Sequence, residues 1–424
     1  MIKRRVVRLL ALMLVTALTV TALGSCVVVG GKDYMTEEDV AKYLASKLGG
    51  NITVEGGDNY DVDISVDGAL NIVAAAKALL SSVSVYCTFS TESVSGWGPG
   101  ASVTTKDVSA AGSGVIYKLD KAQGDAFIIT NYHVVYNKQS VSDNGIAKKI
   151  DLYLYGQESA GYAIPATYVG GSMEYDLAVL RVSGSRILAE SAAVAAELAD
   201  SDSLSVLDTA IAIGNPEGEG ISATVGHVNV DSEYIDMTGA DGSTAVRLRV
   251  IRTDAAVNSG NSGGGLFNDK GQLIGIVNAK MATSSVDNIG YAIPSNVAKY
   301  ISENIIHYCF ETDKTSVYKC LMGITVSAAE AYVDYDTESG RVYKREVVKV
   351  ETVENGAAAS GLLAVGDIIR SITIDGVTYE VDRIFKVVDS MLNARVGSTV
   401  IVTITRGDQE MNITVPITST VVVK

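Results

Sequence analysis

Short apolar runs separated by turn residues dominate the chain from Val83 to about Ser295. Each run is rich in β-branched residues and is bounded by Gly, Asn, Asp or Ser, which is typical of short strands. No long helical pattern interrupts them, whereas residues 296–310 have helical spacing and a smaller mixed β segment follows from about 316. Many short strands at close spacing indicate an all-β barrel or sandwich, so the predicted fold is mainly β. The runs lie at 83–89, 113–119, 126–132, 150–155, 177–182, 209–215, 248–253, 272–278 and 289–294.

A different pattern precedes this region. Residues 36–48 begin with a threonine and three acids and continue with apolar residues at helical spacing, and 69–80 have the pattern of a second helix. Between them, residues 60–66 alternate apolar and polar side chains as a strand does. Residues 32–75 carry no candidate chemistry, so we interpret them as an N-terminal spacer or assembly segment with a short helical part.

Residues 1–31 have the pattern of an export signal. Basic residues precede an uncharged apolar run from Leu9 to Leu23, which Gly24, Ser25 and Cys26 close. This ending is similar to a bacterial lipobox, which would make Cys26 a lipidation site and tether the chain to the cell membrane. Two alternatives stay open. An uncleaved membrane anchor fits because no charge follows until residue 32, and simple secretion fits a small-residue cleavage site. All three predict an extracytoplasmic protein.

Composition narrows the function classes. The 424 residues suggest two or three domains. A net charge of −15 argues against nucleic-acid binding, which needs clustered Lys and Arg. Four cysteines without a C-x-x-C pair, and only three histidines, disfavour both a disulfide scaffold and a zinc site. We therefore expect no cofactor and no metal.

A glycine-rich segment contains the candidate nucleophile. Gly260-Asn261-Ser262-Gly263-Gly264 places one serine where the chain can turn tightly and a substrate can approach. The N–H groups of Gly260 and Ser262 are the expected donors to the oxyanion that forms on attack. A phosphate-binding P-loop is excluded because the Gly-Lys-Ser/Thr ending is missing.

The candidate base and its partner lie earlier in the chain. His133 directly follows a strand pattern, whereas His227 lies in a predicted hairpin and His307 falls outside the all-β region. Asp176 opens an apolar run and is expected to be partly buried, where a carboxylate needs a partner. Asp254 is the alternative acid, but it lies eight residues before Ser262, since 262 − 254 = 8, and more plausibly shapes that loop.

The same glycine-rich segment also fits the nucleophile elbow of α/β-hydrolases. That fold places the histidine after the serine and a helix after the elbow. Here the only later histidine is His307, and the segment is followed by another strand pattern at 272–277. The sequence therefore disfavours an esterase of that class.

Six blocks between residues 112 and 295 resemble, in order, the HtrA/Deg branch of the chymotrypsin-like serine proteases. The blocks are GSGVI, TNYHVV, YDLAVL, IGNP, GNSGG and GYAIPS. The resemblance implies two packed β-barrels in residues 76–300 with a triad in the cleft between them. It assigns His133 as general base, Asp176 as the residue that orients it and Ser262 as nucleophile. It also implies a trimer or a larger homo-oligomer.

The substrate pocket is predicted from the same fold. The residue six positions before the nucleophile lies at the base of the primary pocket, which here is Ala256, since 262 − 6 = 256. The strand that ends in Asn278 and Ala279 is expected to form one wall. An uncharged pocket favours apolar residues before the scissile bond.

Residues 316–422, within a predicted linker helix and C-terminal domain at 301–424, resemble a PDZ domain. Leu321, Met322, Gly323 and Ile324 match the loop whose N–H groups bind a peptide C-terminus, and the next strand would pair with that peptide. Residues 354–362 look like the family's helix. An acidic stretch at 329–346 is additional.

Three functions are compatible with these features. The first is a quality-control endoprotease that hydrolyses unfolded or misfolded exported proteins, and the second is a regulatory protease with one target. The third is a PDZ-dependent chaperone or binding protein, against which three intact catalytic residues argue. The expected partners are unfolded protein or peptide substrates, peptide C-termini and, through the N-terminus, the membrane.

Overall fold

The computed structural model describes residues 72–95, 102–142, 144–157, 161–281, 289–312, 314, 317–338 and 340–423. The lipobox Cys26, the helix predicted at 36–48 and the strand predicted at 60–66 lie outside these residues. The described residues from 72 to 189 and from 193 to 423 group into one compact unit.

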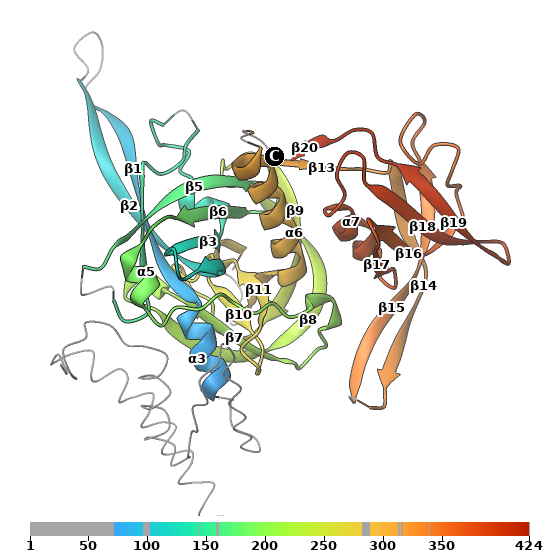
Figure 1. Ribbon diagram of the computed structural model, residues 1–424, viewed down its shortest axis with the longest axis horizontal. Coiled ribbons are helices and arrows are strands. Elements are labelled where there is room, and N and C mark those ends of the chain that lie inside the picture. Colours follow the sequence, from blue (N-terminus) through green and yellow to red (C-terminus); the bar gives the residue numbers. More distant parts are fainter. Residues whose placement is uncertain are drawn as a thin grey trace, which may run out of the picture. The chain divides into compact units, whose positions relative to one another are not determined.

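The first half of this unit is a closed six-stranded barrel (Figure 1). Its strand order is β1-β2-β3-β6-β5-β4, with every neighbouring pair antiparallel. Apolar side chains such as Val85, Ile128 and Leu180 alternate into a core from which solvent is excluded. The strands are β1 Ser82–Ser95, β2 Ser102–Asp120, β3 Asp125–Thr130, β4 Lys149–Leu154, β5 Ile164–Ser172 and β6 Leu177–Val182.

A second closed barrel follows, with strand order β10-β11-β12-β9-β8-β7. Its core contains Ile251, Leu266 and Ile274, all fully buried. Two closed six-stranded barrels in sequence confirm the predicted chymotrypsin-like fold. The strands are β7 Thr209–Gly214, β8 Ser222–Thr238, β9 Ala245–Thr253, β10 Gly265–Phe267, β11 Leu273–Val277 and β12 Gly290–Pro294.

Strands β1, β2 and β9 are longer than their apolar runs predicted, and β5, β8 and β10 were not among the predicted runs. The first ten residues of β2, 102–111, are exposed and pair with the end of β1, and β8 extends beyond the barrel together with β9. The outer β1–β2 ribbon is held by backbone hydrogen bonds with little apolar burial, whereas β9 buries Val246, Leu248 and Val250 in a cluster with side chains of β8. Polar residues along both ribbons interrupt the hydrophobic pattern.

Helices cover or flank the barrels. The helix predicted at 69–80 corresponds to α3, Ile72–Leu80, and α5 is Arg186–Glu190. The helix predicted at 296–310 is α6, Ser295–Ile305, continued by the π-helical segment η6, Ile306–Glu311. Its Val297, Ile301 and Ile305 are buried in the barrel core. The boundary predicted at residue 300 therefore falls inside a helix that packs on the protease barrels.

The C-terminal body is an antiparallel sheet of order β14-β15-β16-β18-β19, with β17 paired to β16 and helix α7, Ile384–Met391, packed beside it. The acidic stretch at 329–346 is the outer part of the β14–β15 ribbon. Residues 354–362 are a series of turns and not the predicted helix, because Gly356 and Gly361 have positive φ. The strands are β14 Ile324–Asp336, β15 Arg341–Val353, β16 Ile368–Ile374, β17 Val377–Glu380, β18 Thr399–Arg406 and β19 Gln409–Pro416.

A small two-stranded sheet joins the linker to the end of the described chain. β13, Val317–Lys319, pairs antiparallel with β20, Val421–Val423 (Figure 1). Cys87, Cys309 and Cys320 are free thiols.

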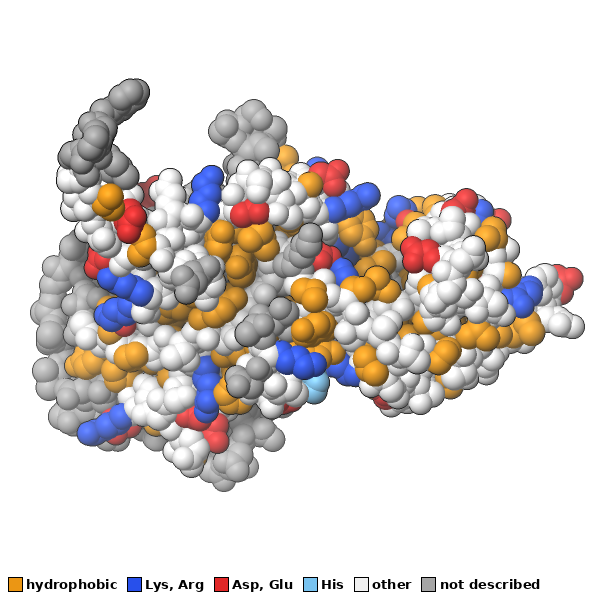
Figure 2. Space-filling view, turned by 90° about the horizontal axis from the view of Figure 1, so that it is seen from above, with side chains coloured by type: hydrophobic (Ala, Val, Ile, Leu, Met, Phe, Trp, Pro, Cys, Tyr) orange, Lys and Arg blue, Asp and Glu red, His pale blue; other side chains and the backbone are white. Residues whose placement is uncertain are grey.

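The charged side chains on the surface are of both signs. Acidic and basic side chains are interspersed on the face seen in Figure 2, without one continuous basic field. Among the described residues, no helix is long and apolar enough to cross a membrane.

Candidate active site

His133 lies where the first barrel ends. The buried strand β3 runs through Asn131 into the short helix α4, Tyr132–Val135, whose Val134 and Val135 are buried. The apolar residues after the histidine anchor this turn in the core, so the imidazole stays at the edge, with 18% of its side chain exposed.

Asp176 lies on the turn between β5 and β6. Its Oδ2 is 2.7 Å from His133 Nδ1, and its Oδ1 accepts a hydrogen bond from the His133 backbone N–H at 3.0 Å. A proton on Nδ1 therefore faces a carboxylate, which leaves Nε2 as the basic nitrogen. The backbone of Asp176 is left-handed, with φ of 48°, a conformation that Asp tolerates better than most residues.

Ser262 lies on the loop between β9 and β10 of the second barrel. Its carbonyl oxygen accepts a hydrogen bond from Ser113 N–H of β2 at 2.8 Å, which ties the loop to the first barrel. Its hydroxyl accepts a hydrogen bond from Ala279 N–H at 3.1 Å. Ser262 is thus located at the junction of the two barrels.

Two glycines of this loop have no room for a side chain. A Cβ on Gly263 would lie 2.2 Å from the Ser113 carbonyl oxygen, and one on Gly260 would lie 2.2 Å from the Asn215 carbonyl oxygen. Both glycines also have positive φ, of 85° and 96°. The glycine-rich sequence is therefore required by close backbone approach and by conformation.

The predicted oxyanion donors keep their N–H groups available. Within the described part of the chain, neither Gly260 N–H nor Ser262 N–H donates to another backbone group, whereas Gly263 N–H donates to Val277 O at 3.0 Å.

Two residues that support the site were not assigned a role from sequence. Buried Ser113 donates its hydroxyl to Gly260 O at 2.7 Å and accepts from Asn215 N–H at 2.8 Å. Asn131 donates its amide to Asp176 O at 2.9 Å. Ser113 lies in the GSGVI block and Asn131 lies two residues before His133. These positions were the only sequence signal that could have indicated their supporting roles.

Asn278 has a place different from the one predicted. Its side chain is fully buried and donates to Asp176 Oδ2 at 2.6 Å, so only its backbone remains for a pocket wall. The next residue, Ala279, is the donor to Ser262 Oγ. One dipeptide after β11 therefore contacts two of the three predicted catalytic residues.

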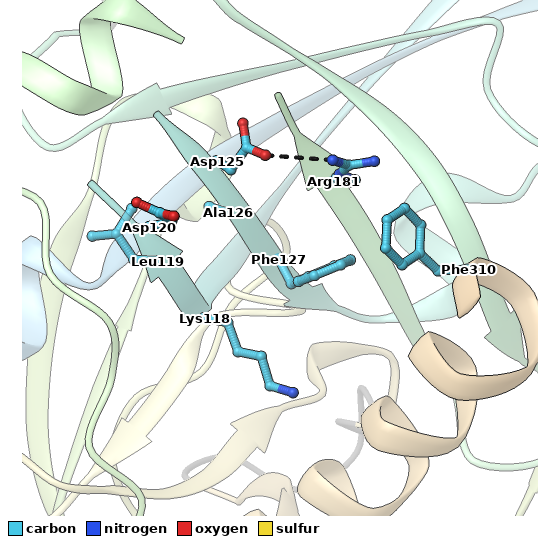
Figure 3. Close-up of a pocket in the computed structure, with 8 residues that line it drawn as sticks. All are labelled: Lys118, Leu119, Asp120, Asp125, Ala126, Phe127, Arg181 and Phe310. Carbon is cyan, nitrogen blue, oxygen red and sulfur yellow. Dashed lines mark hydrogen bonds and ion pairs between the residues drawn. The ribbon is translucent and has the colours of Figure 1, made fainter. Parts of the chain in front are cut away.

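Ala256, predicted at the pocket base, lies exposed on the loop that precedes Ser262, and its carbonyl accepts from Thr224 Oγ1 at 2.8 Å. Its role in specificity stays a prediction. The cavity of about 310 Å³ in Figure 3 is lined by residues of β2, β3 and β6 and by Phe310. Asp125 and Arg181 form an ion pair at its rim, and none of the predicted site residues lines it.

The rival residues lie elsewhere. Asp254 accepts a hydrogen bond from His227 backbone N–H at 2.6 Å, and His307 Nδ1 lies 3.2 Å from Glu311. In the regions that the structure describes, no group of three or more His, Cys, Asp or Glu side chains could hold a metal ion. The structure joins His133 to Asp176, whereas Ser262 Oγ bonds to Ala279 N–H and, among the described residues, no hydrogen bond links it to His133.

The loop at 321–324 precedes the edge strand β14. Gly323 has φ of 75°, its carbonyl accepts from Glu354 N–H at 2.8 Å, and a Cβ there would lie 2.1 Å from the Ala357 Cβ. Met322 is buried, whereas Leu321 is half exposed. The loop is thus held by the turns that follow β15.

Comparison with known proteins agrees with this geometry. Residues 112–276 match the family described as trypsin-like peptidase domain, and together with the two barrels they define a trypsin-like serine endopeptidase. The chain is 34% identical to the serine protease Do-like HtrA of Lactococcus lactis subsp. lactis (strain IL1403), over 76% of this chain and 75% of that relative. The chain belongs to the HtrA family of serine proteases.

More distant similarities include the periplasmic serine endoprotease DegP of Escherichia coli (strain K12), 33% identical over 62% of this chain and 48% of DegP. A solved structure of the HtrA-type protease AlgW with a decapeptide is 27% identical and covers 81% of this chain and 97% of that chain, with a TM-score of 0.49.

Proposed function

We propose that this HtrA-family protease hydrolyses peptide bonds of unfolded or misfolded extracytoplasmic proteins through His133, Asp176 and Ser262. His133 Nε2 takes the proton of Ser262 Oγ as the oxygen attacks the carbonyl carbon, and later gives it to the leaving amine. Asp176 stabilises the imidazolium. The N–H groups of Gly260 and Ser262 stabilise the oxyanion.

The contact between His133 Nδ1 and Asp176 Oδ2, at 2.7 Å, is the observation that carries this proposal. It orients the imidazole at the end of the barrel to which Ser113 ties the Ser262 loop. A chaperone or binding module has no need of this pair, so we favour catalysis over binding as the main activity.

The substrate class is tested with one protein in two states. The purified chain is expected to cleave a reduced, unfolded protein rapidly and its native, disulfide-bonded form slowly, because a cleft between barrels accepts only an extended segment. Cleavage is measured as the rate of new α-amino groups. Equal cleavage of both states would contradict the quality-control function, and no cleavage of either would contradict proteolysis.

The C-terminal body supports a second proposal, that it is a PDZ domain which binds peptide C-termini. Strand β14 lies at the edge of its sheet, and α7 packs nearby. Gly323, in the loop directly before β14, has a left-handed backbone. An extended peptide can add to such an edge while loop N–H groups bind its carboxylate.

A peptide with an apolar C-terminus is therefore expected to bind at Leu321–Ile324 at least about tenfold more tightly as the free acid than as the amide, since hydrogen bonds to a charged acceptor contribute about 1.5–3 kcal/mol. Isothermal titration of both peptides measures this difference. Equal affinities would contradict the carboxylate loop.

We also propose that Cys26 is lipidated and tethers the chain to the bacterial cell membrane. Cys26→Ala is expected to leave the signal unprocessed or to release the chain from membranes, which fractionation and intact-protein mass measure. Unchanged processing and membrane retention would favour the uncleaved anchor instead. The trimer stays a prediction.

A further inference from the structure

The turn that carries Asp176 is also held from outside the barrel. Lys319 Nζ of β13 lies 2.5 Å from Glu174 Oε1, two residues before Asp176. The same ammonium lies 5.5 Å from the ring centroid of Tyr175, the residue between them. Both partners of the ion pair are partly shielded, with 18% of the Lys319 side chain and 35% of the Glu174 side chain exposed.

Lys319 comes from a linker strand that is itself anchored. Val317 of β13 pairs with Val423 of β20, and both are buried in the hydrophobic cluster that includes Ile305 and Ile306. Because this cluster also contains Leu177, the residue after Asp176, the linker and the base of the turn belong to one packed core. The ammonium is therefore presented from a fixed backbone.

The turn is too short to absorb a shift. Ser172 of β5 pairs directly with Leu177 of β6, so four residues, 173–176, make the whole connection. Tyr175 packs into the core, and Asp176 has a left-handed backbone. Only Tyr175 separates Glu174 from Asp176, so a displacement of Glu174 is expected to shift the Asp176 carboxylate as well.

We propose that Lys319 is a positioning residue for catalysis: through Glu174 and Tyr175 it holds the β5–β6 turn so that Asp176 meets His133. The inference rests on the proposed role of Asp176. The inner hydrogen bonds, from His133 and Asn278, orient the carboxylate on its backbone, and the outer contact with Lys319 orients the backbone itself. The linker to the C-terminal body thereby sets the geometry of the catalytic acid.

Lys319→Met tests this role, because methionine keeps an apolar stem and removes the ammonium. Cleavage of a short amidated peptide is measured, so that the carboxylate loop beside Lys319 is not engaged. We expect kcat to fall about tenfold with KM nearly unchanged, since a displacement well under 1 Å at a catalytic group costs roughly this much. The rate at which a fluorophosphonate labels Ser262 is expected to fall in the same proportion.

Two comparisons separate positioning from general stability. Lys319→Arg is expected to restore most of the rate, because it keeps the charge on Glu174. Lys118→Met removes a similar ion pair, Lys118–Glu303 at 2.8 Å, on another face of the same barrel, and is expected to leave kcat and labelling unchanged.

Glu174→Gln is the milder second variant and keeps the test open if Lys319→Met folds poorly. It is expected to lower kcat similarly, and the double variant is expected to be no worse than either single one, because both remove the same contact. Wild-type labelling rates in Lys319→Met or in Glu174→Gln, or a change in KM alone, would overturn the inference. Cleavage that survives in Ser262→Ala would instead overturn the proposed function.

Discussion

Ser262→Ala is expected to lower kcat/KM for an unfolded protein or peptide by about 10⁴–10⁶-fold, because it removes the proposed nucleophile. The fold should persist, since the hydroxyl accepts one hydrogen bond from Ala279 N–H and the loop is also held by backbone hydrogen bonds with Ser113 and Val277. Initial rates with purified protein, together with the thermal midpoint, measure both effects.

His133→Ala is expected to be nearly as severe, and the double variant little worse, because the members of a triad act as a unit. Matched controls lie nearby: exposed Ser259 lies on the same loop, and exposed His227 lies on β8. Alanine at either control position should leave the rate within a few-fold of the wild type. Undiminished cleavage by Ser262→Ala, or an additive double variant, would be incompatible with the assigned triad.

Arg249→Met is expected to destabilise the folded chain by about 3–5 kcal/mol, the range for a buried ion pair that loses one partner. Arg249 of β9 is 5% exposed and bonds to Asp389 of α7 and, at 2.6 Å, to Asp202. Its guanidinium also lies 3.4 Å from the ring centroid of Phe385. Removing the cation leaves two carboxylates without their shared partner, which a fall in the urea midpoint would report.

The loss should grow as the pH rises. Burial raises the pKa of Asp389 to about 6, with Asp202 adding to the rise and Arg249 opposing it. An acid whose pKa is raised by folding stabilises the folded state below its unfolded pKa, near 4, and loses that contribution as the pH rises through about 6. Without Arg249 the penalty is therefore larger at pH 7.5 than at pH 4.5.

Arg247→Met is the matched control for this cluster. Arg247 lies two residues away on the same strand, but its side chain is 70% exposed and 3.9 Å from Asp236. Exposed ion pairs of this kind contribute about 1 kcal/mol or less, so its stability should change little. Equal losses for Arg247→Met and Arg249→Met, or a loss that shrinks with rising pH, would contradict this account of the cluster.

The sequence predicted those strands whose side chains are mostly buried. The apolar runs at 126–132 and 177–182 became β3 and β6, because most of their side chains are buried in the closed barrel. The β14–β15 ribbon was not predicted, because backbone pairing outside a core leaves little hydrophobic pattern. The turns at 354–362 were predicted as a helix, because a resemblance to a helical segment does not reveal the positive φ of Gly356 and Gly361.

The amino-acid sequence by itself determined which residue types form the candidate site and in which order they follow along the chain. Three local patterns can be recognised in the sequence alone. They are a strand pattern shortly before His133, an acid that opens an apolar run at Asp176, and a serine among glycines at 262. The glycines also have a local reason, because positive φ favours them.

Only the tertiary structure decided which distant groups support these residues. Asn278 bonds to a carboxylate 102 positions earlier, Ser113 to a loop 147 positions later, and Lys319 to Glu174 across 145 positions. An asparagine, a serine or a lysine has no sequence signal for such a partner, because each can equally bond to water or to its own loop. Closure of two barrels and a packed linker selects one partner, since burial penalises any polar group left unpaired.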